Sequence, residues 1–206
     1  MKETDSLSIH TKNILGLQLP TDPRWVNLAA ISIEAILTDH AYCEQKAALT
    51  CISLIQRYND KTLMVEELAP IVTEEWGHFR MVLSEINQRN LVLGVQRKDT
   101  YVNELIKYEK KGGSPEDRLL DQLLMFALIE ARSCERFRLL SEQLEDDYLK
   151  AFYRKFMISE AGHYKLFLSL AKEYIPEEKV NARWKQWLDI EKSILPNLEI
   201  RGDRMH

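Results

Sequence analysis

Apolar residues recur every three or four positions along most of the chain, a spacing typical of helices that bury one face. No stretch shows the alternation of apolar and polar residues that predicts a β-strand. The pattern predicts four long helices and two shorter ones, over about residues 22–58, 61–88, 99–111, 114–145, 147–174 and 177–194. We therefore expect an all-α fold.

Turn-forming residues mark the connections between the long helices. Asn59-Asp60 separates the first two, and Asp146-Asp147 separates the last two. Gly112-Gly113-Ser114-Pro115 is the clearest break in the chain and ends a connection of about 25 residues between helices two and three. Inside the second helix, Pro70 must either kink the helix or split it. The pattern thus predicts two helical hairpins joined by a long crossover.

The two ends of the chain are polar and carry little helical pattern. Residues 1–22 look like a loose lead-in to a helix start at Thr21-Asp22-Pro23, and the tail from Leu195 onward is expected to be mobile. Met1 to His10 lack the apolar core of a signal peptide, and no apolar run approaches the ~20 residues that cross a bilayer. We predict a cytoplasmic protein with no membrane partner.

Composition agrees with a single helical domain. The 206 residues include only 7 Gly and 6 Pro, and we expect one domain over 1–206 with its bundle core at about 22–175. The net charge of −4 means that any contact with nucleic acid must use a local basic face. Cys43, Cys51 and Cys134 form no Cys-x-x-Cys pair and are interpreted as reduced thiols.

A short sequence motif, with Glu and His three residues apart, occurs twice in the chain. Glu75-x-Gly-His78 is followed by Phe79, and Glu160-x-Gly-His163 is followed by Tyr164. Residues three apart lie on one face of a helix, so each Glu and His can bind the same metal ion. The two copies, with their matching neighbours, point to a repeated metal-binding element.

Upstream of each motif, a single glutamate lies in an apolar stripe. Glu44 and Glu130 precede Glu75 and Glu160 by 31 and 30 residues, and the midpoint between each of them and the Glu/His pair that follows falls near a predicted turn. An ionised carboxylate in an apolar stripe costs several kcal/mol unless it is paired or metal-bound. Four glutamates and two histidines would then meet at one level of a four-helix bundle, the ligand set of ferritin-like di-iron and di-manganese proteins.

Three nearby residues are rivals for the ligand positions. Glu34 is about 15 Å along the helix from Glu44, too far to share its site. His40 lies one turn from Glu44 and is interpreted as a solvated or core residue, with a role behind the ligand as the alternative. Glu135 falls off the apolar stripe beside Arg132 and Arg138, which predicts a surface ion pair.

The residues around these ligands resemble the tRNA 2-methylthio-isopentenyladenosine hydroxylase family. The likeness covers about residues 25–175 and is carried by His40 to Ala48, Glu74 to Phe79, Glu130 to Phe137 and Ser159 to Tyr164. It implies a ferritin-like non-haem di-iron monooxygenase that uses O2 to hydroxylate the isopentenyl group of the modified adenosine beside the tRNA anticodon. The implied ligands of two iron ions, with manganese as an alternative, are Glu44, Glu75, His78, Glu130, Glu160 and His163.

The same resemblance implies two partners, the tRNA anticodon loop and an electron-donating reductase system. A protein of net negative charge that holds this loop needs a basic rim, for which the candidate substrate-binding residues are Arg132 and Arg136, with Arg89, Arg97, Lys98, Arg138, Arg154 and Lys155 beside them. The alternative functions are a ferritin-like iron-handling or peroxide-scavenging protein and a bundle without metal. The sequence leaves the oligomeric state open.

Overall fold

A computed structural model describes residues 15–206, and within that range the chain forms helices and no strand. The polar start at Met1 to His10 and most of the expected lead-in lie outside the described residues. The described chain divides into two compact units, Arg24–Lys98 with Arg201–Met205, and Asp99–Ile200 with residues 15–23 and His206. Each unit is considered by itself below.

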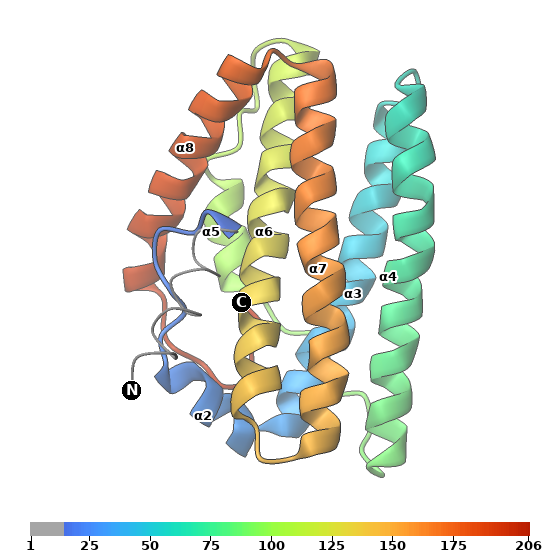
Figure 1. Ribbon diagram of the computed structural model, residues 1–206, viewed down its shortest axis with the longest axis vertical. Coiled ribbons are helices and arrows are strands. Elements are labelled where there is room, and N and C mark those ends of the chain that lie inside the picture. The colour runs from blue at the N-terminus through green and yellow to red at the C-terminus, as the bar shows by residue number, and fades with distance from the viewer. Residues whose placement is uncertain (1–14) are drawn as a thin grey trace. The chain divides into compact units, whose positions relative to one another are not determined.

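The first of these units contains α2 (Arg24–Ile31), α3 (Ile33–Arg57) and α4 (Thr62–Gln88). α3 and α4 pack against each other as an antiparallel hairpin whose turn contains the predicted Asn59-Asp60 (Figure 1). α4 continues through Pro70, so the alternative in which this proline splits the helix is wrong. Glu75 and His78 therefore lie in the second half of one unbroken helix.

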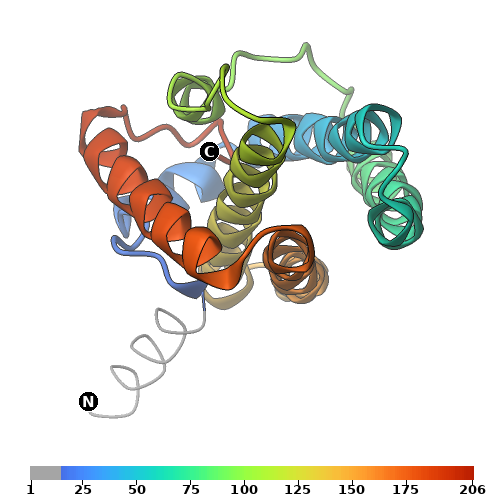
Figure 2. The same ribbon diagram turned by 90° about the horizontal axis from the view of Figure 1, so that it is seen from above.

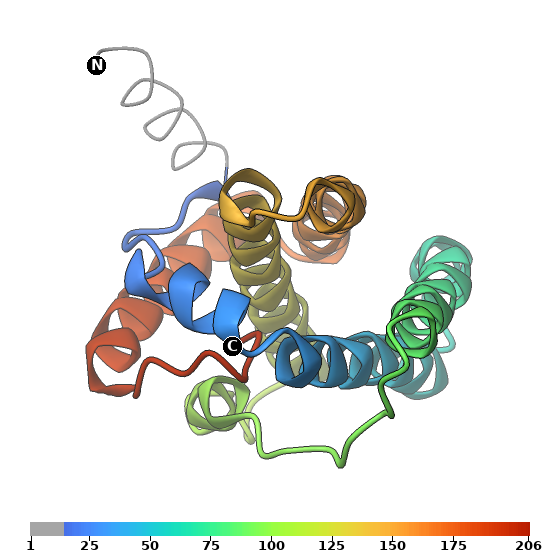
Figure 3. The same ribbon diagram turned by 90° about the horizontal axis from the view of Figure 1, so that it is seen from below.

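The prediction of a single helix over residues 22–58 is wrong, because the chain breaks at Ser32. Its φ and ψ angles of −118° and 41° leave the helical region, and α3 starts in a new direction (Figure 3). A remote segment packs on α2, just before this break. Gly202 lies so close to α2 that a Cβ there would be 2.4 Å from the backbone of Leu28, and the Trp25 indole donates to the Arg204 carbonyl.

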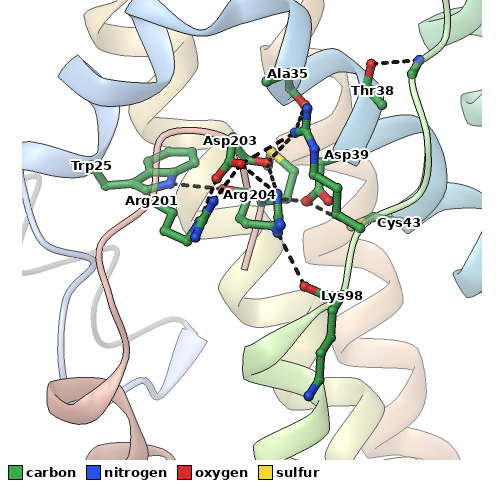
Figure 4. Close-up of polar contacts among 12 residues, drawn as sticks. Trp25, Ala35, Thr38, Asp39, Cys43, Lys98, Arg201, Asp203 and Arg204 are labelled. Carbon is green, nitrogen blue, oxygen red and sulfur yellow. Dashed lines mark hydrogen bonds and ion pairs between the residues drawn. The ribbon is translucent and has the colours of Figure 1, made fainter.

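The tail does not match the predicted mobility either, because residues 201–205 are fixed on α2, α3 and the segment that follows α4 (Figure 4). The Met205 amide donates to Asp39 Oδ2 at 2.8 Å, and Arg97 donates to the Asp203 carbonyl at 3.1 Å. Met205 itself is buried. The tail is thus part of the core of this unit.

The segment between α4 and α5 runs along α3. The Tyr42 hydroxyl donates to the Gly94 carbonyl at 2.9 Å, and the Gly94 amide approaches the Thr38 hydroxyl at 3.4 Å. Residues 89–114 between α4 and α6 form the predicted long crossover, which contains the short helix α5 (Thr100–Ile106).

The second unit contains α5, α6 (Pro115–Gln143), α7 (Asp147–Tyr174) and α8 (Glu177–Ile194), followed by the 3₁₀ helix Leu195–Asn197. α6 and α7 form a hairpin, and α8 packs on α6 (Figure 2). The Ser114-Pro115 start is confirmed, since Ser114 and Asp117 form a reciprocal capping box. Asp146 caps α7 by accepting from the amides of Tyr148 and Leu149. The predicted bounds of α7 and α8 are confirmed.

None of the helices in the described part of the chain is long and apolar enough to cross a membrane.

Candidate metal-binding triads

The α3–α4 hairpin brings together Glu44, Glu75 and His78, which we call the Glu44 triad. His78 Nδ1 lies 3.4 Å from Glu44 Oε2 and 3.4 Å from Glu75 Oε2. One ligand atom from each of the three residues lies within 4.8 Å of the others, and all three side chains are buried. Three of the six predicted ligands are thus placed together, as the mirrored spacing about Asn59-Asp60 predicts.

The α6–α7 hairpin forms a second set, the Glu130 triad, from Glu130, Glu160 and His163. His163 Nδ1 lies 3.6 Å from Glu160 Oε2, and one ligand atom from each residue again lies within 4.8 Å of the others. All three side chains are buried. The two halves of the sequence therefore build the same arrangement, a lone Glu on one helix facing a Glu-x-x-His on the next.

Both triads fit a divalent metal ion. Each places two carboxylates and one imidazole in the protein interior, where two carboxylates without a compensating cation would cost several kcal/mol. Oxygen-rich ligand sets with one imidazole suit iron or manganese. In burial and donor chemistry, both triads fit a metal ion of this kind.

The imidazole of His40 contacts the carboxylate of Glu44. Its Nε2 lies 2.6 Å from Glu44 Oε1, and its side chain is buried, which rules out the solvated role. A hydrogen bond of this kind fixes the orientation of a ligating carboxylate. The signal in the sequence was the spacing of four residues, which places His40 on the face of Glu44. Glu34, by contrast, is exposed, in agreement with its exclusion.

The three cysteines form no disulfide within residues 15–206. Cys51 and Cys134 are buried and Cys43 is half-buried. The Cys134 thiol donates to the Met157 carbonyl, and burial, followed by the negative charge of Glu160, raises its pKa to about 12. This thiol therefore stays protonated beside the Glu130 triad.

The prediction that Arg132 lies on an exposed rim is wrong. Its side chain is fully buried, contacts Glu135 and donates to Glu191 Oε1 at 2.9 Å. It also donates to the Thr21 hydroxyl and the Leu19 carbonyl. Glu135 does form the predicted ion pair, but in the interior and not at the surface. Arg132 is a structural residue of this unit, because its donors are taken up by internal acceptors.

Arg136 does not lie on an open rim either. Its side chain is half-buried, and burial, followed by repulsion from Arg132, lowers its pKa to about 10. A guanidinium in this position is a weak candidate for contact with a macromolecule, because solvent reaches only part of it.

Crowding by neighbouring atoms does not explain the glycines of the two Glu-x-Gly-His motifs. A Cβ at Gly77 or Gly162 would meet no described atom within 4 Å. We expect Gly77→Ala and Gly162→Ala each to raise the free energy of unfolding by about 1 kcal/mol, since Ala is the better helix former. Thermal denaturation should show a rise of about 2–4 °C. Gly202→Ala is the control and should lower the melting temperature, because its Cβ would overlap Leu28.

The similarity to known proteins covers almost the whole chain. The model of the family tRNA-(MS[2]IO[6]A)-hydroxylase (MiaE) matches residues 8–206. A tRNA 2-(methylsulfanyl)-N(6)-isopentenyladenosine(37) hydroxylase from Pseudomonas putida is 35% identical over 164 residues, which cover 80% of this chain and 78% of that protein. A hydroxylase of the same name from Salmonella typhimurium is 27% identical over 236 aligned positions, covering 90% of this chain and 86% of that protein.

A solved structure is similar as well. Protein 43 with aldehyde deformylating oxygenase activity from Synechococcus is 35% identical and superimposes with a TM-score of 0.87, covering 92% of this chain and 94% of the other. The all-α, ferritin-like fold class predicted from the sequence is confirmed. Since the family model spans residues 8–206, the chain belongs to the tRNA-(MS[2]IO[6]A)-hydroxylase (MiaE) family.

Proposed function

We propose that the chain hydroxylates the isopentenyl group of 2-(methylsulfanyl)-N6-isopentenyladenosine in tRNA, at the nucleoside beside the anticodon. The observation that carries this proposal is the pair of matching triads in a chain of this hydroxylase family. The reaction inserts one oxygen atom of O2 into a C–H bond. The other oxygen atom leaves as water, with two electrons and two protons supplied by a donor.

We propose that the cofactor is two iron ions, one bound by Glu44, Glu75 and His78 and the other by Glu130, Glu160 and His163. When bound, this pair of metal ions supplies the redox chemistry that activates O2. The carboxylates balance the charge of the ions, and His40 keeps the carboxylate of Glu44 in its orientation. Phe156 and Phe167, one turn before Glu160 and one turn after His163, are buried and exclude water.

The electrons come, in this proposal, from a separate reductase system. The three cysteines of the described residues are free thiols. An external donor also fits an enzyme of the cytoplasm, where tRNA is modified. The alternative of an iron-handling or peroxide-scavenging protein is not favoured, because the relatives are hydroxylases of tRNA.

A product assay tests the proposal. Iron-reconstituted protein, a chemical or enzymatic reductant and tRNA that carries the methylsulfanyl-isopentenyl nucleoside should yield the hydroxylated nucleoside, detected by mass spectrometry after digestion. With isotopically labelled O2 the label should enter the product, because the inserted oxygen comes from O2. Omission of the reductant or of iron is the control. Consumption of peroxide or uptake of iron without any hydroxylated nucleoside would instead favour the iron-handling alternative.

A further inference from the structure

The exposed face of α7 is basic along its middle. Between residues 151 and 170 the exposed positions are Ala151, Arg154, Lys155, Ile158, Gly162, Lys165 and Ser169. Apart from Arg154 they are spaced alternately by four and three residues, so they form one stripe along the helix. We call Arg154, Lys155, Ile158, Gly162 and Lys165 the α7 stripe. It carries three positive charges and no negative charge in a chain of net charge −4.

The cations of the stripe differ from their neighbours in their partners. At the two ends of α7, Lys150 pairs with Asp147 at 2.9 Å, and Lys172 pairs with Glu177 at 2.5 Å. No carboxylate of the described chain lies within ion-pair distance of Arg154, Lys155 or Lys165. The middle of the helix therefore presents positive charge that no carboxylate among residues 15–206 neutralises.

The shape of the stripe suits a charged polymer. Lys155 and Lys165 are ten residues apart, about 15 Å along a helix. Between them lies Gly162, where a Cβ would meet open space, so the backbone of α7 is bare at that point. A sugar–phosphate chain can approach such a surface closely while its phosphates contact the flanking cations.

We infer that the α7 stripe binds the phosphate backbone of the substrate tRNA, an inference that rests on the proposed function. The negative net charge of the protein would repel RNA everywhere except at a local basic face. A linear array of cations on one helix, with no carboxylate partner in the described part of the chain, matches a linear array of phosphates. The same helix carries Glu160 and His163 on its buried side, which ties the position of the bound backbone to the Glu130 triad.

Charge reversal tests the inference. We expect Lys155→Glu/Lys165→Glu in the iron-loaded protein to weaken the affinity for the substrate tRNA at least tenfold at low salt. Each phosphate contact that is lost should also reduce the slope of log affinity against log salt by about 0.7 to 0.9. The matched control is Lys185→Glu/Lys192→Glu on α8, which makes the same change in net charge at two exposed positions. The control should keep affinity within about twofold of the wild type.

Three results would overturn the inference. First, the stripe variant could keep an affinity for tRNA within about twofold of the wild type, as the control should. Second, the stripe variant and the control could lose tRNA affinity equally, which would assign the loss to net charge alone. Third, the stripe variant could bind tRNA normally but need a higher concentration of the electron donor, which would assign the stripe to an acidic protein partner. Iron content and the visible absorption of the variant check that its triads are intact.

The wild-type product assay separates this inference from the function on which it rests. Hydroxylated nucleoside from the wild type, together with unchanged tRNA binding by the stripe variant, overturns only the role of the α7 stripe. Failure of the wild type to make any product overturns the proposed function, and the inference about the stripe with it.

Discussion

His78→Ala and His163→Ala should each leave the protein with one tightly bound iron ion in place of two and without hydroxylase activity. Each histidine is the only imidazole in its triad, so its loss removes one of three protein ligands from one ion. Even residues that merely orient a ligand are worth about 10- to 100-fold in metal affinity, so loss of a ligand should cost about a hundredfold or more. Iron analysis after reconstitution and desalting measures the stoichiometry directly.

The control for this experiment is His206→Ala, which removes an imidazole outside the triads. His206 lies 2.8 Å from the Ser133 hydroxyl and stacks on Tyr101, so its replacement should leave two iron ions bound. Wild-type protein that binds one iron ion or none would contradict the assignment of both triads. Full turnover by either triad variant would remove that histidine from the set of ligands.

Arg132→Met should destabilise the protein by about 3 to 5 kcal/mol, the loss expected when one partner of a buried ion pair is removed. The substitution leaves the carboxylates of Glu135 and Glu191 in the interior without their guanidinium. Urea denaturation gives the free energy of unfolding. The matched control is Arg138→Met on the same helix, since Arg138 pairs with the exposed Glu142 and should contribute no more than about 1 kcal/mol.

The pH dependence of this variant identifies the cause of its instability. Burial already raises the pKa of Glu191, although Arg132 opposes the rise. Without Arg132 the folded-state pKa of this carboxyl should lie further above its unfolded value, so the folded state binds the proton more tightly. Stability from a raised pKa is present at low pH and is lost as the pH rises through the folded-state pKa. The loss in free energy of unfolding that Arg132→Met causes should therefore be smaller at pH 5 than at pH 8. A loss that is the same at both pH values would point to lost packing instead.

Local signals predict the two hairpins and the candidate ligands that each hairpin brings together. The bounds of α7 and α8 follow from caps and turn residues next to them in the sequence, such as Asp146. The members of each triad lie on neighbouring helices of one hairpin, and a tight turn fixes which residues face each other. The spacing of Glu44 and Glu130 from the two Glu-x-Gly-His motifs was therefore enough to predict the triads.

Contacts between remote segments explain what the sequence did not predict. Arg132 looks like a surface residue beside other charges, but its partner Glu191 is 59 positions away on α8. The break at Ser32 follows a helix on which residues 201–205 pack, and Arg204 in that segment is 179 positions from its partner Trp25. No periodicity within a helix carries information about a partner at that distance.

The attachment of residues 201–205 to α2 and α3 also affects the order in which the chain can fold during synthesis. The Asp39 carboxylate cannot meet the Met205 amide until 166 further residues have been added, which takes roughly 10 to 30 s at about 5–20 residues per second. Throughout that time Trp25 and Asp39 lack the partners that residues 204 and 205 provide in the finished protein. The unit that contains α2, α3 and α4 thus leaves the ribosome early but is completed only when residues 201–205 have been added, and a chaperone that shields apolar surface would be needed most at its α2 end.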